Sequence, residues 1–368
     1  MIWAFVIIIT IYVITIALLV YGFFKVKKYQ KSDLEAITKF TVIVPFRNEK
    51  ENLPILLESL SNLNYPAPLF EVVLVDDDSD EKFEVSGFRF EVLLIDNIRT
   101  SNSPKKDAIS TAMKHVKTDW VITTDADCIV PPNWLLTFDN YIQENNISML
   151  AGAVTYNCEN SFLHHFQQLD LTSLQGATIG SFGIKKAFMC NGANFAYKKS
   201  LFEKLNGFEG NDKIASGDDV FLLQKVANLY PYQINYLKSE EIIIQTKPTE
   251  TWKSLFYQRV RWAAKTSSYK STFGKVLGLI VFLANLSFVC GFLLLILEIL
   301  YWQFLVLFVF LKLTIDFVLL YITNNFLTNS SRIKSLLLSS LLYPFFSSAV
   351  ALYSLFGPYK WKGRSFKS

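Results

Sequence analysis

Two acidic clusters follow apolar segments of the sequence and contain the residue types that bind a metal ion. One is Asp76-Asp77-Asp78-Ser79-Asp80, and the other is Asp125-Ala126-Asp127. Two aspartates separated by one residue point to the same side of an extended chain, where both carboxylates can reach one hard cation. Each cluster alone is equally typical of a solvated turn or a helix cap. Together they favour a site for Mg²⁺ or Mn²⁺, with substrate phosphates completing the coordination.

A third acidic pair stands before a predicted helix. Ser216-Gly217-Asp218-Asp219 leads into Val220–Lys225, which is predicted to be helical. Carboxylates at a helix start can simply cap the helix and offset its dipole. Alternatively, one of them can act as a general base whose pKa is raised by the neighbouring carboxylate. The residues alone leave both interpretations open.

The segment Trp252–Tyr269 combines basic and aromatic residues at helical spacing, directly before an apolar region. This pattern is typical of an amphipathic helix lying at a membrane surface. Arg259 and Arg261 could equally clamp a diphosphate through paired hydrogen bonds. The segment therefore joins a membrane feature to a candidate ligand site.

Short apolar strands alternate with helices between residues 40 and 124, and two of the strands end in the acidic clusters. The predicted strands are Phe40–Pro45, Glu71–Val75, Phe90–Ile95 and Trp120–Thr124, and the predicted helices are Asn52–Leu60 and Pro104–His115. This alternation predicts an α/β domain with a mainly parallel sheet, in which ligands bind beyond the carboxyl ends of the strands. No glycine-rich phosphate loop occurs, which disfavours a Rossmann dehydrogenase and a P-loop NTPase.

The composition divides the chain into a globular part and membrane-embedded parts. Of the 368 residues, 51% are hydrophobic and 18% are charged, whereas soluble domains carry about 25% charged residues. Residues 1–24 have no charged side chain and residues 275–357 have six. The predicted organisation is a transmembrane anchor at 1–24, a cytoplasmic globular domain at 25–250, an interfacial helix at 251–274, transmembrane or re-entrant helices at 275–357, and a basic tail at 358–368.

The membrane topology follows from the distribution of lysines and arginines. Four lysines (Lys25, Lys27, Lys28 and Lys31) follow the first apolar segment, which predicts an uncleaved anchor and a cytoplasmic globular domain. The C-terminal region has three apolar segments, at 276–297, 304–323 and 335–356. Three spans would leave the basic tail outside, against the positive-inside rule, so one segment is a candidate for a re-entrant or interfacial helix. Lys312 and Asp316 are predicted to pair inside the bundle, with a polar substrate path as the alternative.

Net charge and cysteine usage limit the partners and the compartment. The net charge of +4 is modest and its local excess lies beside the membrane segments. Anionic lipid headgroups explain this placement better than nucleic acid does, so no nucleic-acid partner is predicted. The four cysteines form no metal-binding pattern, and free thiols in a reducing compartment are expected.

The globular region resembles the family 2 glycosyltransferases, which are inverting enzymes of the GT-A fold and include membrane-bound cellulose and poly-N-acetylglucosamine synthases and ceramide glucosyltransferases. The resemblance covers roughly residues 41–265. Its motifs, in the order of the family, are Val-Ile-Val-Pro-Phe-Arg-Asn-Glu from Val42, Val-Asp-Asp-x-Ser from Val75, Lys105, Asp125-Ala-Asp127, Asn191-Gly-Ala-Asn194, Gly217-Asp-Asp219 and Gln258-Arg-Val-Arg-Trp262.

The resemblance implies a role for each matching position. Asp219 matches the catalytic base, and Asp218 stands where the family usually has Glu. Asp125 and Asp127 would hold Mg²⁺ or Mn²⁺ against the donor diphosphate. Lys105 would lie near the uracil and ribose, although Pro104-Lys105 departs from the usual Gly-Lys. The donor-binding positions implied are Pro45, Glu49, Asp76, Asp77, Lys105, Asp125, Gln258, Arg261 and Trp262.

The expected activity is transfer of a sugar from a nucleotide sugar, expected to be UDP-linked, to a lipid or lipid-linked acceptor at the cell membrane. A processive polysaccharide synthase of the same family is the main alternative, and the small number of predicted spans disfavours it. A non-catalytic nucleotide-sugar-binding membrane scaffold is disfavoured because Asp125, Asp127 and Asp219 are all present. A nucleotidyltransferase shares the sheet type but gives no reason for a membrane tail.

Overall fold

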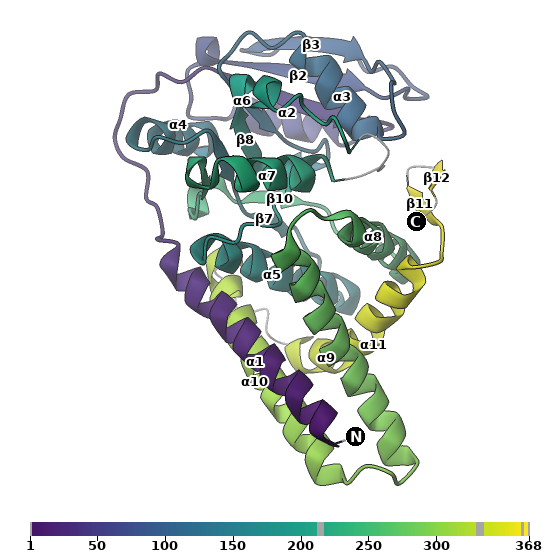
Figure 1. Cartoon of the computed structure of the whole chain (residues 1–368). Coiled ribbons are helices and arrows are strands. Elements are labelled where there is room, and N and C mark those ends of the chain that lie inside the picture. Colours follow the sequence, from purple (N-terminus) through teal and green to yellow (C-terminus); the bar gives the residue numbers. More distant parts are fainter. Residues whose placement is uncertain (1, 212–216, 329–334, 362–363, 367–368) are drawn as a thin grey trace. The chain divides into compact units, whose positions relative to one another are not determined.

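The structure of the chain is a computed structural model that describes residues 2–211, 217–328, 335–361 and 364–366. It divides into two compact units (Figure 1). The sheet unit comprises residues 27–157 and 187–247, and the helical unit comprises residues 1–26, 158–186 and 248–368. The predicted globular domain of residues 25–250 thus encloses one segment, 158–186, that packs with the helical unit.

A seven-stranded mixed sheet forms the centre of the sheet unit. Its strands, in spatial order, are β3 (Glu91–Asp96), β2 (Phe70–Asp76), β1 (Phe40–Phe46), β4 (Trp120–Thr123), β8 (Phe195–Lys198), β6 (Met149–Ala151) and β9 (Ile234–Tyr236). The first four strands are parallel to one another, and β6 is parallel to β9. Only β8 runs antiparallel to its neighbours β4 and β6. The mainly parallel α/β sheet expected from the sequence is confirmed.

Helices and a smaller sheet complete this unit. The helices are α2 (Leu53–Ser61), α3 (Pro104–Met113), α4 (Trp134–Glu144), α6 (Lys199–Lys204) and α7 (Asp218–Leu229), with short 3₁₀ turns at η1 (Ala67–Leu69), η2 (Gly192–Asn194), η3 (Pro231–Gln233) and η4 (Glu240–Ile242). The second sheet consists of β5 (Cys128–Ile129), β10 (Ile244–Thr246) and β7 (Val154–Tyr156).

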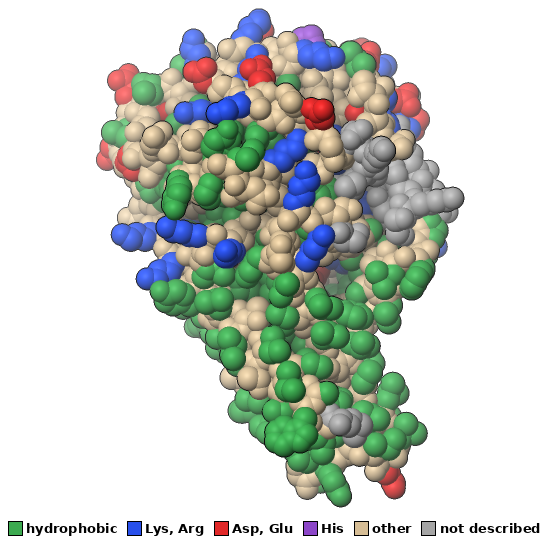
Figure 2. Space-filling model, viewed as in Figure 1, with side chains coloured by type: hydrophobic (Ala, Val, Ile, Leu, Met, Phe, Trp, Pro, Cys, Tyr) green, Lys and Arg blue, Asp and Glu red, His purple; other side chains and the backbone are tan. Residues whose placement is uncertain are grey.

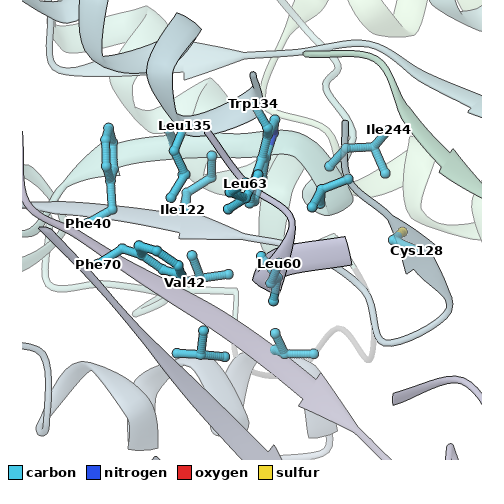
Figure 3. Packing of buried hydrophobic residues seen from close by; sticks show 14 of the residues in the cluster. Phe40, Val42, Leu60, Leu63, Phe70, Ile122, Cys128, Trp134, Leu135 and Ile244 are labelled. Carbon is cyan, nitrogen blue, oxygen red and sulfur yellow. The ribbon is translucent and has the colours of Figure 1, made fainter. Parts of the chain in front are cut away.

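The core of the sheet unit explains why the strands read as continuous apolar runs. Both faces of β1 are covered, so that Val42, Ile43 and Val44 are all fully buried, as is usual for central parallel strands. Figure 3 shows part of this core, with Phe40, Phe70 and Leu135 among its labelled side chains. The leucines on the buried face of α2 pack into the same cluster. This rigid layer fixes the positions at which the strands end.

The helical unit is built almost entirely of helices. They are α1 (Ile2–Lys25), α5 (Phe162–Gly183), α8 (Trp252–Ala264), the 3₁₀ turn η5 (Lys265–Ser268), α9 (Thr272–Ile296), α10 (Trp302–Thr328) and α11 (Leu336–Ser354), followed by a hairpin of β11 (Tyr359–Trp361) and β12 (Arg364–Phe366). Within the described residues, α1, α9, α10 and α11 are long and apolar enough to cross a membrane. Hydrophobic side chains cover α1, α9 and α10 in Figure 2. These helices indicate a membrane protein.

Glycines allow α1 and α5 to pack with their backbones almost in contact. A Cβ atom on Gly180 would lie 2.3 Å from the carbonyl oxygen of Leu19, and one on Gly183 would lie 1.8 Å from that of Gly22. No side chain fits at these positions. Helix α5 was not expected from the sequence, because its many polar residues obscure any apolar stripe. Its polar groups bind within the helical unit; Gln167, for example, donates to the carbonyl of Thr249 and accepts from its amide, both at 2.8 Å.

The predicted ion pair between Lys312 and Asp316 is confirmed. The ammonium of Lys312 lies 2.6 Å from the Asp316 carboxylate within α10. The hydroxyl of Tyr12 on α1 donates to the other oxygen of Asp316, also at 2.6 Å. This triad ties α1 to α10, because a buried charge in an apolar bundle needs partners on a neighbouring helix.

Candidate active site

The acidic residues at the end of β2 are held by a network at the carboxyl edge of the sheet. Asp76 and Asp77 are 3% and 6% exposed. Asp76 accepts a hydrogen bond from the amide of Ser79 at 2.9 Å, which closes the acidic turn. Asp77 accepts from the Asn97 side chain at 2.6 Å and from the Arg99 guanidinium at 3.3 Å. Neither Asn97 nor Arg99 stood out in the sequence, since both follow β3 outside any acidic motif.

The end of β1 lies beside this turn. Pro45 pairs with Val75 in the parallel register, and Arg47 donates to the main-chain oxygen of Asp77 at 2.8 Å. Glu49 accepts from the side chain of Asn52 at 2.5 Å at the start of α2. The structure therefore brings Pro45 and Asp77, two of the predicted donor-binding residues, to one edge of the sheet.

Lys105 is the centre of a second cluster at this edge. Its ammonium lies 2.5 Å from Asp125 and 3.6 Å from Asp218. Burial lowers the pKa of Lys105, but the carboxylates of Asp125, Asp218 and Asp219 outweigh burial and raise that pKa above its ordinary value. The lysine thus carries its charge at neutral pH. One cation joins an aspartate that follows β4 to the acidic pair at the start of α7.

Asp219 is more exposed than Asp218 and is oriented by two backbone amides. One carboxylate oxygen accepts from the amide of Gly192 at 2.9 Å, and the other accepts from the amide of Val220 at 2.7 Å. Each oxygen retains a second lone pair, so the carboxylate can still accept a proton. Val220 belongs to α7, so the carboxylate of Asp219 binds an amide at the start of this helix, as a cap does. The same side chain is the candidate base, and the two interpretations are compatible.

Because residue 192 is a glycine, the Asn191-Gly-Ala-Asn194 segment can lie close to the acidic pair and to Lys105. A Cβ atom there would lie 3.1 Å from the Asp218 carboxylate and 3.3 Å from the Lys105 ammonium. Thr123, the last residue of β4, donates to the carbonyl of Gly192 at 2.6 Å and fixes the turn. The sequence analysis singled out Asn191–Asn194 as a family motif but did not predict its contact with the acidic pair.

Asp125 and Asp127 are the candidate pair for a divalent cation. They lie between β4 and β5, and both side chains are partly exposed. Among the residues that the structure describes, no three His, Cys, Asp or Glu side chains gather as a metal site. A cation held here would take its other ligands from water and from a diphosphate, which is the usual arrangement for Mg²⁺. At the neighbouring Cys128, burial and the charges of Asp127 and Asp125 raise the pKa of the thiol, which favours its neutral form.

Gln258, Arg261 and Trp262 lie on α8 in the helical unit. The intervening Arg259 is 5% exposed and forms an ion pair with Asp170 of α5. The central guanidinium carbon of Arg259 lies 4.1 Å from the ring centre of Trp262. Gln258 accepts a hydrogen bond from the same guanidinium. Arg259, one of the two arginines considered as a diphosphate clamp, is therefore committed to holding α8 against α5. Its partner Asp170 was not foreseen, because α5 was not predicted.

A mainly parallel sheet with acidic groups gathered at its carboxyl edge is the architecture of a GT-A transferase, and comparison with solved structures agrees. The chain is similar to the mannosyltransferase PcManGT from Pyrobaculum calidifontis, solved in complex with GDP-Man and Mn²⁺, with a TM-score of 0.57. The alignment covers 96% of this chain and 99% of that chain at 16% identity, so the likeness is one of fold.

Residues 41–206 match the family described as Glycosyl transferase family 2, so the chain contains a domain of this family, which supports a transferase. The predicted family, fold and enzyme class are confirmed.

Three curated proteins illustrate the relationship. A probable glycosyltransferase, YdaM of Bacillus subtilis, is 27% identical over 245 residues, which cover 63% of this chain and 56% of YdaM. An uncharacterized glycosyltransferase of Haemophilus influenzae is 26% identical over 60% of this chain and 75% of that protein. Undecaprenyl-phosphate 4-deoxy-4-formamido-L-arabinose transferase of Yersinia enterocolitica is 34% identical over 27% of this chain and 32% of that protein. The chain thus spans about half of the first relative and a third of the last.

Proposed function

We propose that this protein is a membrane-bound inverting glycosyltransferase that moves one sugar from a nucleotide sugar to a hydroxyl group of a lipid or lipid-linked acceptor. The observation that carries this proposal is the cluster around Lys105. It joins Asp125, a candidate metal ligand, to Asp218 and Asp219, which include the candidate base. A donor-binding group and a proton acceptor are therefore neighbours at the edge of the sheet where ligands of such folds bind.

The reaction needs one base and a stabilised leaving group. The acceptor oxygen forms a bond to the anomeric carbon from the face opposite the diphosphate, and the bond from that carbon to the diphosphate oxygen breaks with its electron pair. The carboxylate of Asp219 takes the hydroxyl proton. The hydrogen bonds from Gly192 and Val220 hold this carboxylate in one orientation, which matters because general-base help depends on positioning.

The charge of the departing diphosphate must be neutralised on the donor side. Mg²⁺ or Mn²⁺ bound by Asp125 and Asp127 would supply this Lewis-acid stabilisation. In the structure one oxygen of Asp125 binds Lys105. The ammonium is thereby held next to the carboxylate that would carry the cation, where its positive charge also suits a phosphate oxygen.

Two observations support an acceptor in the membrane. The described chain contains four helices that are long and apolar enough to cross a bilayer. One relative, matched along about a third of its length, is a transferase whose name specifies undecaprenyl phosphate. Lys25 at the end of α1 and Lys27 and Lys28 directly after it are all exposed, as expected for a flank on the cytoplasmic side. We place the sheet unit in the cytoplasm, where nucleotide sugars are available as donors.

The first test measures sugar transfer by the purified protein. UDP- and GDP-sugars are supplied with Mn²⁺ or Mg²⁺ and total membrane lipids, and the products are identified by mass spectrometry. Asp219→Asn is expected to lower kcat by about 10²–10⁴-fold, because the amide cannot accept the proton. The matched control is Asp119→Asn, at an exposed aspartate before β4, which should leave kcat unchanged.

Each part of the proposal has its own contrary outcome. If Asp219→Asn transfers sugar as fast as the parent, the base is another group. Removal of divalent cations should abolish transfer, and added Mn²⁺ or Mg²⁺ should restore it; full activity after chelation would exclude the metal at Asp125 and Asp127. A product carrying many sugars would establish a processive synthase instead of a single transfer.

A further inference from the structure

Lys106, next to the lysine of the acidic cluster, is a buried cation that the proposed reaction does not yet use. It lies on α3, and its side chain is 2% exposed. Burying an ammonium group is costly unless it is hydrogen bonded or paired. Neighbouring residues of a helix point in different directions, so the side chains of Lys105 and Lys106 contact different residues.

The contacts of Lys106 lie on both sides of the acidic pair in the sequence. Its ammonium donates to the main-chain oxygen of Asn211 at 2.6 Å, and Asn211 precedes Asp218 and Asp219. The same ammonium lies 4.9 Å from the ring centre of Phe221, which follows Asp219 on α7. A cation over an aromatic face is attracted by the ring quadrupole, more strongly where water is excluded. The Lys106 side chain of α3 thus contacts the chain both before and after the candidate base.

Lys106 also lines a cleft of about 660 Å³ between α3 and the chain around Phe202–Glu209. The chain on the far wall is also anchored by Lys225 of α7, which donates to the carbonyls of Leu205 and Gly207 at 3.3 and 2.8 Å. Lys225 ties this wall to α7, whereas Lys106 ties Asn211, just beyond the wall, and Phe221 of α7 to α3, which carries Lys105.

We propose, on the basis of the proposed function, that Lys106 is a positioning residue that sets Asp218 and Asp219 against Lys105. Lys105 binds the acidic pair directly, and Lys106 holds the chain on both sides of that pair to the same helix. The distance between the base and the donor site then depends on α3. Because small misplacement of a catalytic group is costly, loss of Lys106 affects kcat more than donor binding.

The test compares Lys106→Met, which keeps the length of the side chain and removes its charge, with Lys106→Arg. Lys199→Met is the matched control, because Lys199 donates to the carbonyl of Val116 at 2.8 Å and so also ties a helix to a main-chain oxygen near α3. We expect K106M to lower kcat by about 100-fold with the donor KM within about threefold. K106R should recover much of the activity, since it can donate to the same carbonyl and stack on Phe221.

A second readout does not depend on sugar transfer. Amide hydrogen exchange in residues 217–229 should be faster in K106M than in the parent and unchanged in K199M. Phe221→Leu, which removes only the ring beneath the ammonium, should lower kcat by a smaller factor in the same direction. The proposal is overturned if K106M retains the parent kcat, or if K106M and K199M lose kcat equally. If the parent transfers no sugar, the proposed function fails, and the exchange measurement alone decides the role of Lys106.

Discussion

Two lysines of the sheet unit show how surroundings decide what a buried charge does. Lys105 faces three carboxylates, which raise its pKa despite its burial. The pKa of Lys238 shifts in the opposite direction. This lysine is 8% exposed, and burial and the nearby charge of Lys28 lower its pKa to about 8. The first lysine is stabilised as a cation and organises a site. The second is a cation at neutral pH only at a cost to the folded state.

Replacement of Lys238 by Met should therefore stabilise the protein near neutral pH. The lysine pKa is 10.5 in the unfolded chain and about 8 in the folded chain, so the unfolded state binds more protons between these values and stability rises with pH there. At pH 7 the whole penalty is present. We expect K238M to gain about 1–2 kcal/mol at pH 7, allowing for solvent screening.

Thermal unfolding at pH 7 and at pH 10 measures this difference. The gain of K238M over the parent should shrink at the higher pH, because the parent lysine is then neutral in the folded state. Lys117→Met, at an exposed position, should show no such pH dependence. A K238M variant that is less stable than the parent at pH 7 would contradict the assignment.

Single residues also show how far the site could be predicted from the sequence. Asp76, Asp125 and Asp219 were recognisable because strand ends and helix starts are local features with known chemistry. The contact of Lys105 with Asp125 and Asp218 was not, since it joins three segments that only the fold brings together. The requirement for glycine at position 192 was equally hidden in the sequence. It arises because a Cβ atom there would lie close to the side chains of Asp218 and Lys105.

At the level of elements, the strands and helices of residues 40–124 were predicted nearly to the residue, while α5 was missed. The first group has buried apolar runs separated by polar turns, which is a pattern that one sequence reveals. Helix α5 buries polar residues such as Gln167, Asp170 and Thr172. Their partners, which include Thr249 and Arg259, are distant in the sequence. A helix stabilised by distant polar partners has no periodicity to detect.

The close packing of α1 and α5 can be tested with one methyl group. Gly180→Ala would place a Cβ atom 2.3 Å from the Leu19 carbonyl oxygen, so the two helices must separate. We expect a loss of about 1–3 kcal/mol, as for other overpacked sites. Gly278→Ala on α9 is the matched control, because its nearest neighbour would be 3.4 Å away. It should be neutral or gain up to about 1 kcal/mol from helix propensity.

Thermal unfolding in detergent compares these two alanine variants. Equal midpoints for G180A and G278A would show that the α1–α5 contact is looser than the structure indicates. A selective loss in G180A would instead establish that segment 158–186 is held by the membrane anchor.

At the level of the whole molecule, helix α11 bears on the topology that the sequence left open. Its mean hydropathy of 1.6 is the lowest of the four candidate spans, and Pro344 interrupts it. Its N-cap residue, Ser335, lies 3.0 Å from the ring nitrogen of His165 on α5. Near its other end, Tyr353 contacts Phe256 of α8 with ring centres 5.4 Å apart. Neither α5 nor α8 is among the candidate spans within the described residues.

We therefore expect α11 to enter the membrane and return on the side where α5 and α8 lie, so that only α1, α9 and α10 cross. The basic tail at 358–368, whose side chains lie outside the described residues, would then share the compartment of the sheet unit, in agreement with the positive-inside rule. A reporter fused after Ser368 tests this directly, with fusions in the loops at residues 30 and 299 as controls for the two sides. The reporters at 30 and 368 should give the same signal and the one at 299 the opposite. If the reporter at 368 agrees instead with that at 299, α11 crosses the bilayer and the tail lies outside despite its charge.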